Sequence, residues 1–197
     1  MTTRLGRYGK PMQVAVNVSA RQLAEGSSFV ELVEQTLARH SLSPASLLLE
    51  VTESALMEDA EAAVLVLADL KGLGVMIAID DFGTGYSSLS YLQRFPVDHL
   101  KIDMSFVARL DQRTENDMIV RSVIELTRAV GIEAVAEGVE TREQLAALRR
   151  LGCIFGQGFL WSRSLPPVDL ETYVTTERPD TSHPFSLPRP IRSAATS

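Results

Sequence analysis

Carboxylate side chains recur along the chain where short apolar runs end, and one lysine lies inside such a run. Bringing these charges together at one place requires a cation, since mutual repulsion and desolvation raise the pKa values of crowded carboxylates. The group contains no histidine or cysteine, and carboxylate and amide oxygens suit Mg²⁺ or Mn²⁺ better than Zn²⁺. An all-oxygen metal site is therefore the first hypothesis. The residues concerned are the acids Glu50, Asp80, Asp81, Asp103 and Glu137, with the lysine Lys101 and the amide Asn17.

Two details indicate what such a metal site would do. Asp80 and Asp81 are neighbours, so they can bridge or divide two metal ions, as in the hydrolysis of phosphodiesters. Lys101, one of three lysines in the chain, can hold or polarise a water or a phosphate oxygen. The alternative is that Lys101 only neutralises the neighbouring carboxylates. A Schiff-base role is disfavoured, because it needs an apolar pocket that lowers the pKa of the lysine.

The elements that must position these residues alternate between short apolar runs and longer amphipathic stretches. This alternation, repeated about six times, predicts an α/β fold with a parallel sheet and helical crossovers. All strands of a parallel barrel point one way, so the polar residues at their carboxyl ends are expected to converge at one rim, together with Glu53, Glu140 and Gln157. We expect strands at 14–17, 47–52, 75–80, 99–103, 134–137 and 154–160, and helices at 28–40, 59–73, 87–94, 115–130 and 142–151.

Pleat alternation indicates which of these side chains share a face. In the run 99–103, Lys101 and Asp103 lie on one face, and Leu100 and Ile102 lie on the other. We expect the polar face to line the barrel axis and the apolar face to pack under helices.

Composition and charge exclude several classes of protein. The chain has 197 residues, of which 45% are hydrophobic and 22% are charged, as in ordinary globular domains. Its net charge of −6 argues against binding to nucleic-acid polymers, which favours a basic face. No apolar run can span a membrane, no export leader is visible and Cys153 is the single cysteine, so the sequence favours a cytoplasmic protein. We expect one domain over 1–174 and a disordered tail rich in proline and serine over 175–197.

Six motifs make the sequence resemble the EAL-domain family, the bacterial phosphodiesterases of cyclic di-GMP. They occur in the family's order, cover the chain from Val14 to about Tyr173, and form a highly specific combination. The motifs are VAVNVSARQL at 14–23, LLLEVTES at 47–54, IAIDDFGTGYSSLSYL at 77–92, VDHLKIDMSFV at 97–107, AVAEGVET at 134–141 and LGCIFGQGFLWSRSLP at 151–166.

The resemblance implies a (β/α)₈ barrel of the TIM type that cuts one phosphodiester bond of cyclic di-GMP to give linear pGpG, with Mg²⁺ or Mn²⁺. By the same resemblance, Lys101 holds and activates the attacking water, and Lys101 and Glu137 are the catalytic pair. Asp103 and Gln157 match further active-site positions. The remaining matches are the metal ligands Asn17, Glu50, Asp80 and Glu137, the second-metal ligand Asp81, and the acids Glu53 and Glu140, which brace the Asp-Asp-Phe-Gly loop.

The sequence also departs from the family at its start. The family's first two strand–helix units, which include the Glu-Ala-Leu strand and a further metal ligand, have no counterpart before 14–17. The triplet Glu61-Ala62-Ala63, on a helix, is no substitute. We therefore expect an incomplete barrel of about six units, truncated at its N-terminus, with open edges at 14–17 and 154–160. Since exposed edges invite pairing, a homodimer or a partner domain is expected to complete it.

Three functions remain open. The first is hydrolysis of cyclic di-GMP, impaired by the missing units. The alternative is a catalytically inactive module that binds cyclic di-GMP or another protein. A third is an unrelated metal-dependent barrel lyase or aldolase, in which Lys101 would form a covalent adduct with a carbonyl substrate.

Overall fold

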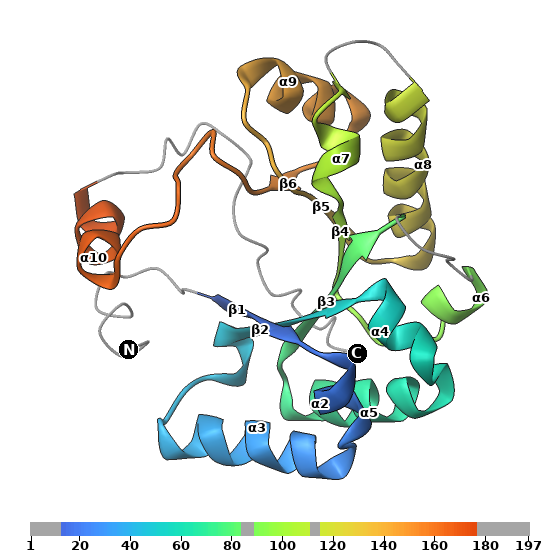
Figure 1. Ribbon diagram of the computed structural model, residues 1–197, viewed down its shortest axis with the longest axis vertical. Coiled ribbons are helices and arrows are strands. Elements are labelled where there is room, and N and C mark those ends of the chain that lie inside the picture. The colour runs from blue at the N-terminus through green and yellow to red at the C-terminus, as the bar shows by residue number, and fades with distance from the viewer. Residues whose placement is uncertain (1–12, 84–88, 111–114, 177–197) are drawn as a thin grey trace, which may run out of the picture.

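The computed structural model describes residues 13–83, 89–110 and 115–176, which form one curved parallel sheet with helices on its outer side (Figure 1). The strands lie side by side in chain order, and each pairs in parallel with the next. This is the α/β architecture predicted from the strand–helix alternation. The strands are β1 Val14–Val18, β2 Leu47–Thr52, β3 Met76–Phe82, β4 His99–Ile102, β5 Glu133–Ala136 and β6 Phe155–Gly156.

Helices occupy the connections between the strands. The four long predicted helices are confirmed to within one residue at each end, whereas the short helices that follow β1, β2 and β4, and the last helix, are not predicted. The helices are α2 Ala20–Ala24, α3 Ser27–Arg39, α4 Glu53–Glu58, α5 Ala60–Leu73, α6 Leu89–Leu92, α7 Met104–Val107, α8 Glu115–Val130, α9 Arg142–Leu151 and α10 Pro167–Thr176, with a 3₁₀ turn at Pro44–Ser46.

Side-chain caps explain where several helices begin. A Ser, Thr or Asp side chain accepts a hydrogen bond from a backbone N–H of the first turn, which would otherwise lack a partner. Two of these caps are complete capping boxes, closed by Gln22 and Gln144. The capping residues are Ser19, Thr52, Asp59, Asp103 and Thr141.

Alternate strand residues point to opposite faces of the sheet, as predicted. Leu100 and Ile102 of β4 have no exposed surface and belong to the core that the helices cover. Lys101, between them, points to the other face and lines a cavity inside the barrel. Other residues that line this cavity are Leu48, Glu50, Ala78, His99, Phe155 and Gln157.

The described part of the sheet does not close on itself. β1 and β6 are its two edges, on either side of an opening (Figure 1). On β1, Val14 and Val16 are 47% and 44% exposed, although they are apolar strand residues. Within residues 13–83, 89–110 and 115–176, the prediction of an incomplete barrel with two open edges is confirmed.

The last strand is shorter than predicted. The sequence predicts a strand over 154–160, but only Phe155–Gly156 pairs with β5. Beyond it, the backbone bonds to the loop after β5: the Val139 N–H donates to the Gln157 carbonyl (3.0 Å), and the Leu160 N–H donates to the Val139 carbonyl (2.9 Å). These loop contacts use the groups that a longer ladder would need, so the strand prediction is wrong from Gln157 onward.

The end of the fourth strand also differs from the prediction. The sequence predicts a strand through Asp103, but β4 ends at Ile102. The Asp103 carboxylate accepts a hydrogen bond from the Ser105 N–H (2.9 Å), which starts α7. Competition from a short capping side chain therefore ends the strand one residue early.

Two expectations fall mainly outside the described residues. The predicted tail lies there from residue 177, and α10 ends at Thr176. The glycine-rich loop after Asp81 is described only as far as Gly83. Within the described residues, every helix is too short or too polar to cross a membrane.

Gly158→Ala is expected to destabilise the protein by about 1–3 kcal/mol, the usual cost of overpacking. A Cβ at Gly158 would lie 2.3 Å from the backbone N and O of Val139, so the segment after β6 would have to move. Urea unfolding followed by circular dichroism measures the loss. The control is Gly72→Ala in α5, where a Cβ meets open space and alanine is expected to gain up to about 1 kcal/mol. Equal stability of the two variants would contradict this prediction.

Candidate metal and active site

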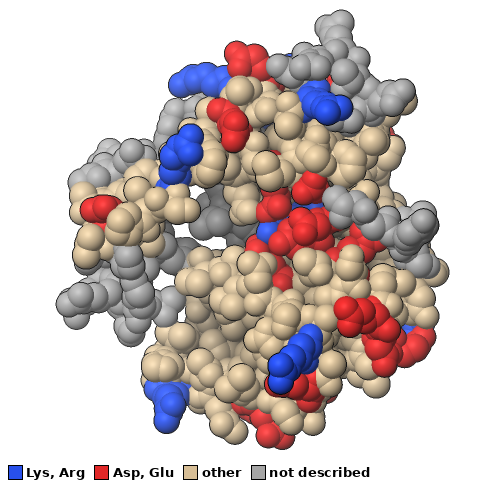
Figure 2. Space-filling view, in the orientation of Figure 1, with Lys and Arg blue, Asp and Glu red and all other residues tan. Residues whose placement is uncertain are grey.

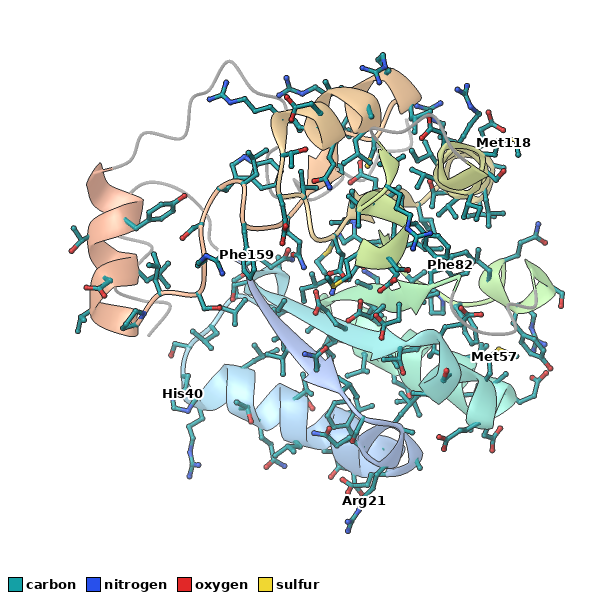
Figure 3. The ribbon with its side chains drawn as sticks, turned by 45° about the horizontal axis from the view of Figure 1, so that its top comes forward. Arg21, His40, Met57, Phe82, Met118 and Phe159 are labelled. Atoms are coloured by element: carbon teal, nitrogen blue, oxygen red, sulfur yellow. The ribbon has the colours of Figure 1, made fainter. Side chains whose placement is uncertain are left out.

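Lys101 lies at the centre of a ring of carboxylates contributed by three other strands or strand ends. Its Nζ is 2.9 Å from Glu50 Oε2, 3.0 Å from Asp80 Oδ1 and 2.7 Å from Glu137 Oε1. The lysine side chain is 5% exposed, and the side chains of Glu50, Asp80 and Glu137 are 9%, 13% and 16% exposed. The predicted convergence of these residues at one rim is what the geometry shows. Figure 3, turned from the first view, shows Phe82 marking the end of β3 beside this rim.

Three carboxylates exceed one ammonium by two charges, and both burial and these charges act on the pKa values of Lys101 and Glu137. Burial alone would lower the pKa of Lys101, but the hydrogen bonds that Lys101 donates to Glu137, Glu50 and Asp80 outweigh it, so the pKa is raised. Burial raises the pKa of Glu137, Lys101 opposes this, and Asp80 and Glu50 add to it. Lys101 is therefore charged at neutral pH, and the site still favours a further cation.

Three carboxylates of the group are close enough to share one cation. Asp80, Asp81 and Glu137 each offer an oxygen, and these oxygens all lie within 4.8 Å of one another. Asp81 has a positive φ of 55°, and its pKa is raised by burial and by the charges of Asp80 and Asp103. Figure 2 shows acidic side chains gathered near the middle of the visible face. The set holds only oxygen ligands, which fits the predicted Mg²⁺ or Mn²⁺.

Two predicted residues support this group directly. Gln157 donates from Nε2 to Glu137 Oε1 (2.6 Å), so Glu137 is held by an amide as well as by Lys101. Glu53, at the start of α4, is buried, and its Oε2 accepts a hydrogen bond from the Gly83 N–H (3.2 Å). Glu53 therefore anchors the backbone two residues after Asp81.

The other three predicted residues lie around the group with weaker ties to it. Asn17 is exposed on β1 and lies in register with Glu50 of β2. The charge of Asp103 helps to raise the pKa of Asp81, but the Asp103 carboxylate accepts its hydrogen bonds from the backbone N–H and the hydroxyl of Ser105. Glu140 is exposed, and its contact among the described residues is from the backbone N–H to Gln144, so no bracing contact to the segment after Asp81 is visible there.

An ion pair at the opposite ends of the strands carried no recognisable signal in the sequence. Lys71, near the end of α5, contacts both carboxylate oxygens of Asp98 at 2.8 Å, although 27 residues separate them. Helix-end lysines and pre-strand aspartates are common, so nothing marked these two as partners. Only the fold brings them together.

His99 is expected to make the protein less stable below neutral pH. It is buried on β4, and neither ring nitrogen has a hydrogen-bond partner among the described residues. Burial lowers its pKa, which Asp98 opposes in part and Lys71 reinforces. The unfolded chain therefore takes up a proton near pH 6.5 that the folded chain resists, so stability present above this pH is lost as the pH falls.

Melting temperatures of the wild type and of His99→Gln, measured from pH 7.5 down to about pH 5.5, test this. We expect a steeper fall for the wild type, because both proteins keep all other titrating groups. Parallel curves would contradict the assignment.

A family model now decides where the chain belongs: the model described as "EAL domain" matches residues 1–164. The chain is a member of the EAL domain family. Among its relatives is the bifunctional diguanylate cyclase/cyclic di-GMP phosphodiesterase MucR of Pseudomonas aeruginosa, which is 48% identical over 157 residues, or 80% of this chain. The chain spans only about a fifth of that protein, 23% of its length.

Solved EAL structures share the fold. The phosphodiesterase of P. aeruginosa MucR in complex with c-di-GMP superposes with a TM-score of 0.79 and 46% identity, covering 86% of this chain and 69% of that one. Klebsiella pneumoniae BlrP1, solved with manganese and c-di-GMP, gives a TM-score of 0.73 and 36% identity, covering 80% of this chain and 41% of that one. The six parallel strands are thus part of a TIM-like EAL barrel, as the motifs indicated.

Proposed function

We propose that this EAL domain hydrolyses cyclic di-GMP to linear pGpG and uses Mg²⁺ or Mn²⁺. The observation that carries the proposal is the group of Asp80, Asp81 and Glu137, whose oxygens lie within 4.8 Å of one another beside Lys101. The names of MucR, a cyclic di-GMP phosphodiesterase, and of the BlrP1 complex with manganese and c-di-GMP support it.

The residues present fit a divalent cation. The group is all oxygen, and burial, with the neighbouring carboxylates adding to it, raises the pKa values of Asp81 and Glu137. In our proposal Glu50, Asp80 and Glu137 hold one metal with Asn17, and Asp81 holds a second. A metal bound here would stabilise the negative charge that develops on the phosphate during cleavage.

Lys101 and Glu137 have different parts in this proposal. The raised pKa of Lys101 keeps its ammonium protonated. Its three N–H groups contact Glu50, Asp80 and Glu137 in the metal-free chain, so one of these contacts would be exchanged for the attacking water that Lys101 orients. Glu137, which lies beside Lys101 and is held by Gln157, accepts the proton of that water. Gln157 and Lys101 both contact Glu137 Oε1, so Oε2 is the oxygen without a contact to either of them.

The remaining roles complete the proposal. Glu53 and Glu140 brace the segment after Asp81, and Glu53 does so by accepting a hydrogen bond from the Gly83 N–H. Asp103 and Gln157 contact the substrate or its immediate surroundings. We assign the domain to 1–174 and a tail to 175–197. We also propose a cytoplasmic location, in keeping with one free, buried cysteine, Cys153.

The open edges favour a second candidate function. Within the described residues, β1 and β6 have no strand partner on their outer sides. If the barrel stays open in this way, the domain would be a catalytically inactive module that binds cyclic di-GMP or another protein. In the first proposal, a second copy of the chain or a partner domain completes the barrel at these edges, where Val14 and Val16 are exposed.

Turnover of cyclic di-GMP by the purified chain, with Mn²⁺ or Mg²⁺, separates the two functions. Linear pGpG, measured by chromatography and absent from Glu50→Ala, supports the phosphodiesterase. Binding of cyclic di-GMP by calorimetry without product supports the inactive module. Neither binding nor product from folded protein would refute both, and trapping of a carbonyl compound on Lys101 by borohydride would favour the lyase or aldolase.

A further inference from the structure

An ion pair ties three elements together at the ends of the strands remote from the acidic rim. Lys71 Nζ donates to Asp98 Oδ1 and Oδ2, both at 2.8 Å, and to the Val75 carbonyl at 3.1 Å. Asp98 Oδ2 also accepts the Ile77 N–H of β3 at 2.8 Å. The backbone repeats the link, since the Asp98 N–H donates to the Ile77 carbonyl at 2.9 Å. The end of α5, the start of β3 and the approach to β4 are thus joined by one carboxylate.

The ladder between β3 and β4 is interrupted next to the acidic rim. It has two regular residue pairs, Ala78 with His99 and Ile79 with Leu100, before the register shifts between Ile79 and Phe82, and one pair, Phe82 with Ile102, after the shift. The extra length at this irregularity contains Asp80 and Asp81. A bulge displaces the side chains that follow it, so the two acids depend on where β3 is anchored.

The anchor and the acidic rim are equally far apart on both strands. Ile77 precedes Asp80 by three residues, and Asp98 precedes Lys101 by three residues, a rise of about 10 Å on each strand. Holding Ile77 against Asp98 therefore puts Asp80 beside Lys101, where the two side chains meet at 3.0 Å. A slip of one residue would turn the acid to the opposite face.

We propose that Lys71 and Asp98 are positioning residues, which hold β3 in register with β4 and thereby place Asp80 against Lys101. The consequence for catalysis rests on the proposed function, but the consequence for geometry does not. Lys71 and Asp98 act on Lys101 from the far ends of the strands and touch neither substrate nor metal.

The lysine ammonium groups allow a test that needs neither metal nor substrate. The chain has three lysines, so a sample labelled with ¹⁵N-lysine gives at most three side-chain signals, and Lys101→Met assigns the one of interest. Its ammonium is buried and bonded to three carboxylates, so its signal reports their placement. Asp98→Asn and Lys71→Met are compared with Lys71→Arg, which keeps the ion pair, and with Leu37→Ala, which removes core volume from α3.

We expect the Lys101 signal to shift or disappear in Asp98→Asn and Lys71→Met, and to stay in place in Lys71→Arg and Leu37→Ala. Where turnover is measurable, kcat should fall about tenfold in Asp98→Asn with little change in KM. An unmoved Lys101 signal in both Asp98→Asn and Lys71→Met would overturn the proposal, as would an equal shift in Leu37→Ala. If the wild type turns over no cyclic di-GMP but the signal moves as expected, the proposed function fails and the positioning role stands.

Discussion

Lys101→Met is expected to reduce the free energy of unfolding in metal-free buffer by about 3–5 kcal/mol, the usual cost of removing one partner from a buried ion pair. The variant leaves Glu50, Asp80 and Glu137 buried together without the ammonium that they contact at 2.7–3.0 Å. Urea unfolding, with the denaturant midpoint compared at equal slope, measures the loss. Turnover of cyclic di-GMP should also be lost, because no group remains to orient the water.

Manganese gives this prediction its internal control. A divalent cation supplies the positive charge that Lys101→Met lacks, so adding Mn²⁺ should recover more stability in the variant than in the wild type. Arg94→Met is the matched surface control, because Arg94 pairs with Glu61 in an exposed ion pair, and exposed ion pairs contribute little to stability. A loss in Lys101→Met no larger than in Arg94→Met would show that the buried acids do not need this charge.

Asp80→Asn is expected to lower kcat for cyclic di-GMP by about a thousandfold, equivalent to about 4 kcal/mol of transition-state stabilisation. The substitution keeps the size of the side chain but removes its negative charge. That charge faces the Lys101 ammonium, and it belongs to the carboxylate group that Asp80 forms with Asp81 and Glu137. Mn²⁺ affinity, measured by electron paramagnetic resonance, should fall in parallel with the rate.

A control variant with the same change of net charge, but far from the proposed metal site, shows whether the loss of one negative charge alone lowers Mn²⁺ affinity. Asp69→Asn lies on the exposed side of α5 and should leave both kcat and Mn²⁺ affinity unchanged. If Asp80→Asn retained wild-type affinity for Mn²⁺, the group around Asp80 would not be the metal site.

The rim was predictable because it depends on strand direction alone. Glu50, Asp80 and Glu137 lie at the carboxyl ends of parallel strands, and any closed or curved parallel sheet brings such residues together. Charge counting predicted a metal ion among these acids, and contact of Lys101 with the carboxylates was the alternative that the sequence left open. The long helices were predictable for a related reason, since their apolar periodicity extends over three or four turns.

The ends of the strands depend on competition between hydrogen bonds of the sheet and hydrogen bonds of nearby caps and loops. A pattern of apolar residues does not show which of these bonds form. Asp103 ends β4 by capping α7, and the segment after β6 bonds to Val139 in place of a further strand. The contact of Glu53 with the segment after Asp81 could be predicted only from the resemblance to the family. The same resemblance assigns Glu140 to that segment, but the Glu140 side chain is exposed, so its role stays a prediction. The pairing of Lys71 with Asp98 required the fold itself.

The two open edges imply a gradient of local unfolding across the sheet. β3 and β4 have partners on both sides, whereas β1 and β6 are each held on one side within the described residues, so the edges should fray at a lower free energy than the centre. Asp80 and Lys101 lie on the stable central strands, while Asn17 and Gln157 belong to or follow the edges. A ligand that contacts all four of these residues would have to order the edge strands as it binds. The entropy lost by β1 and β6 would therefore weaken its affinity.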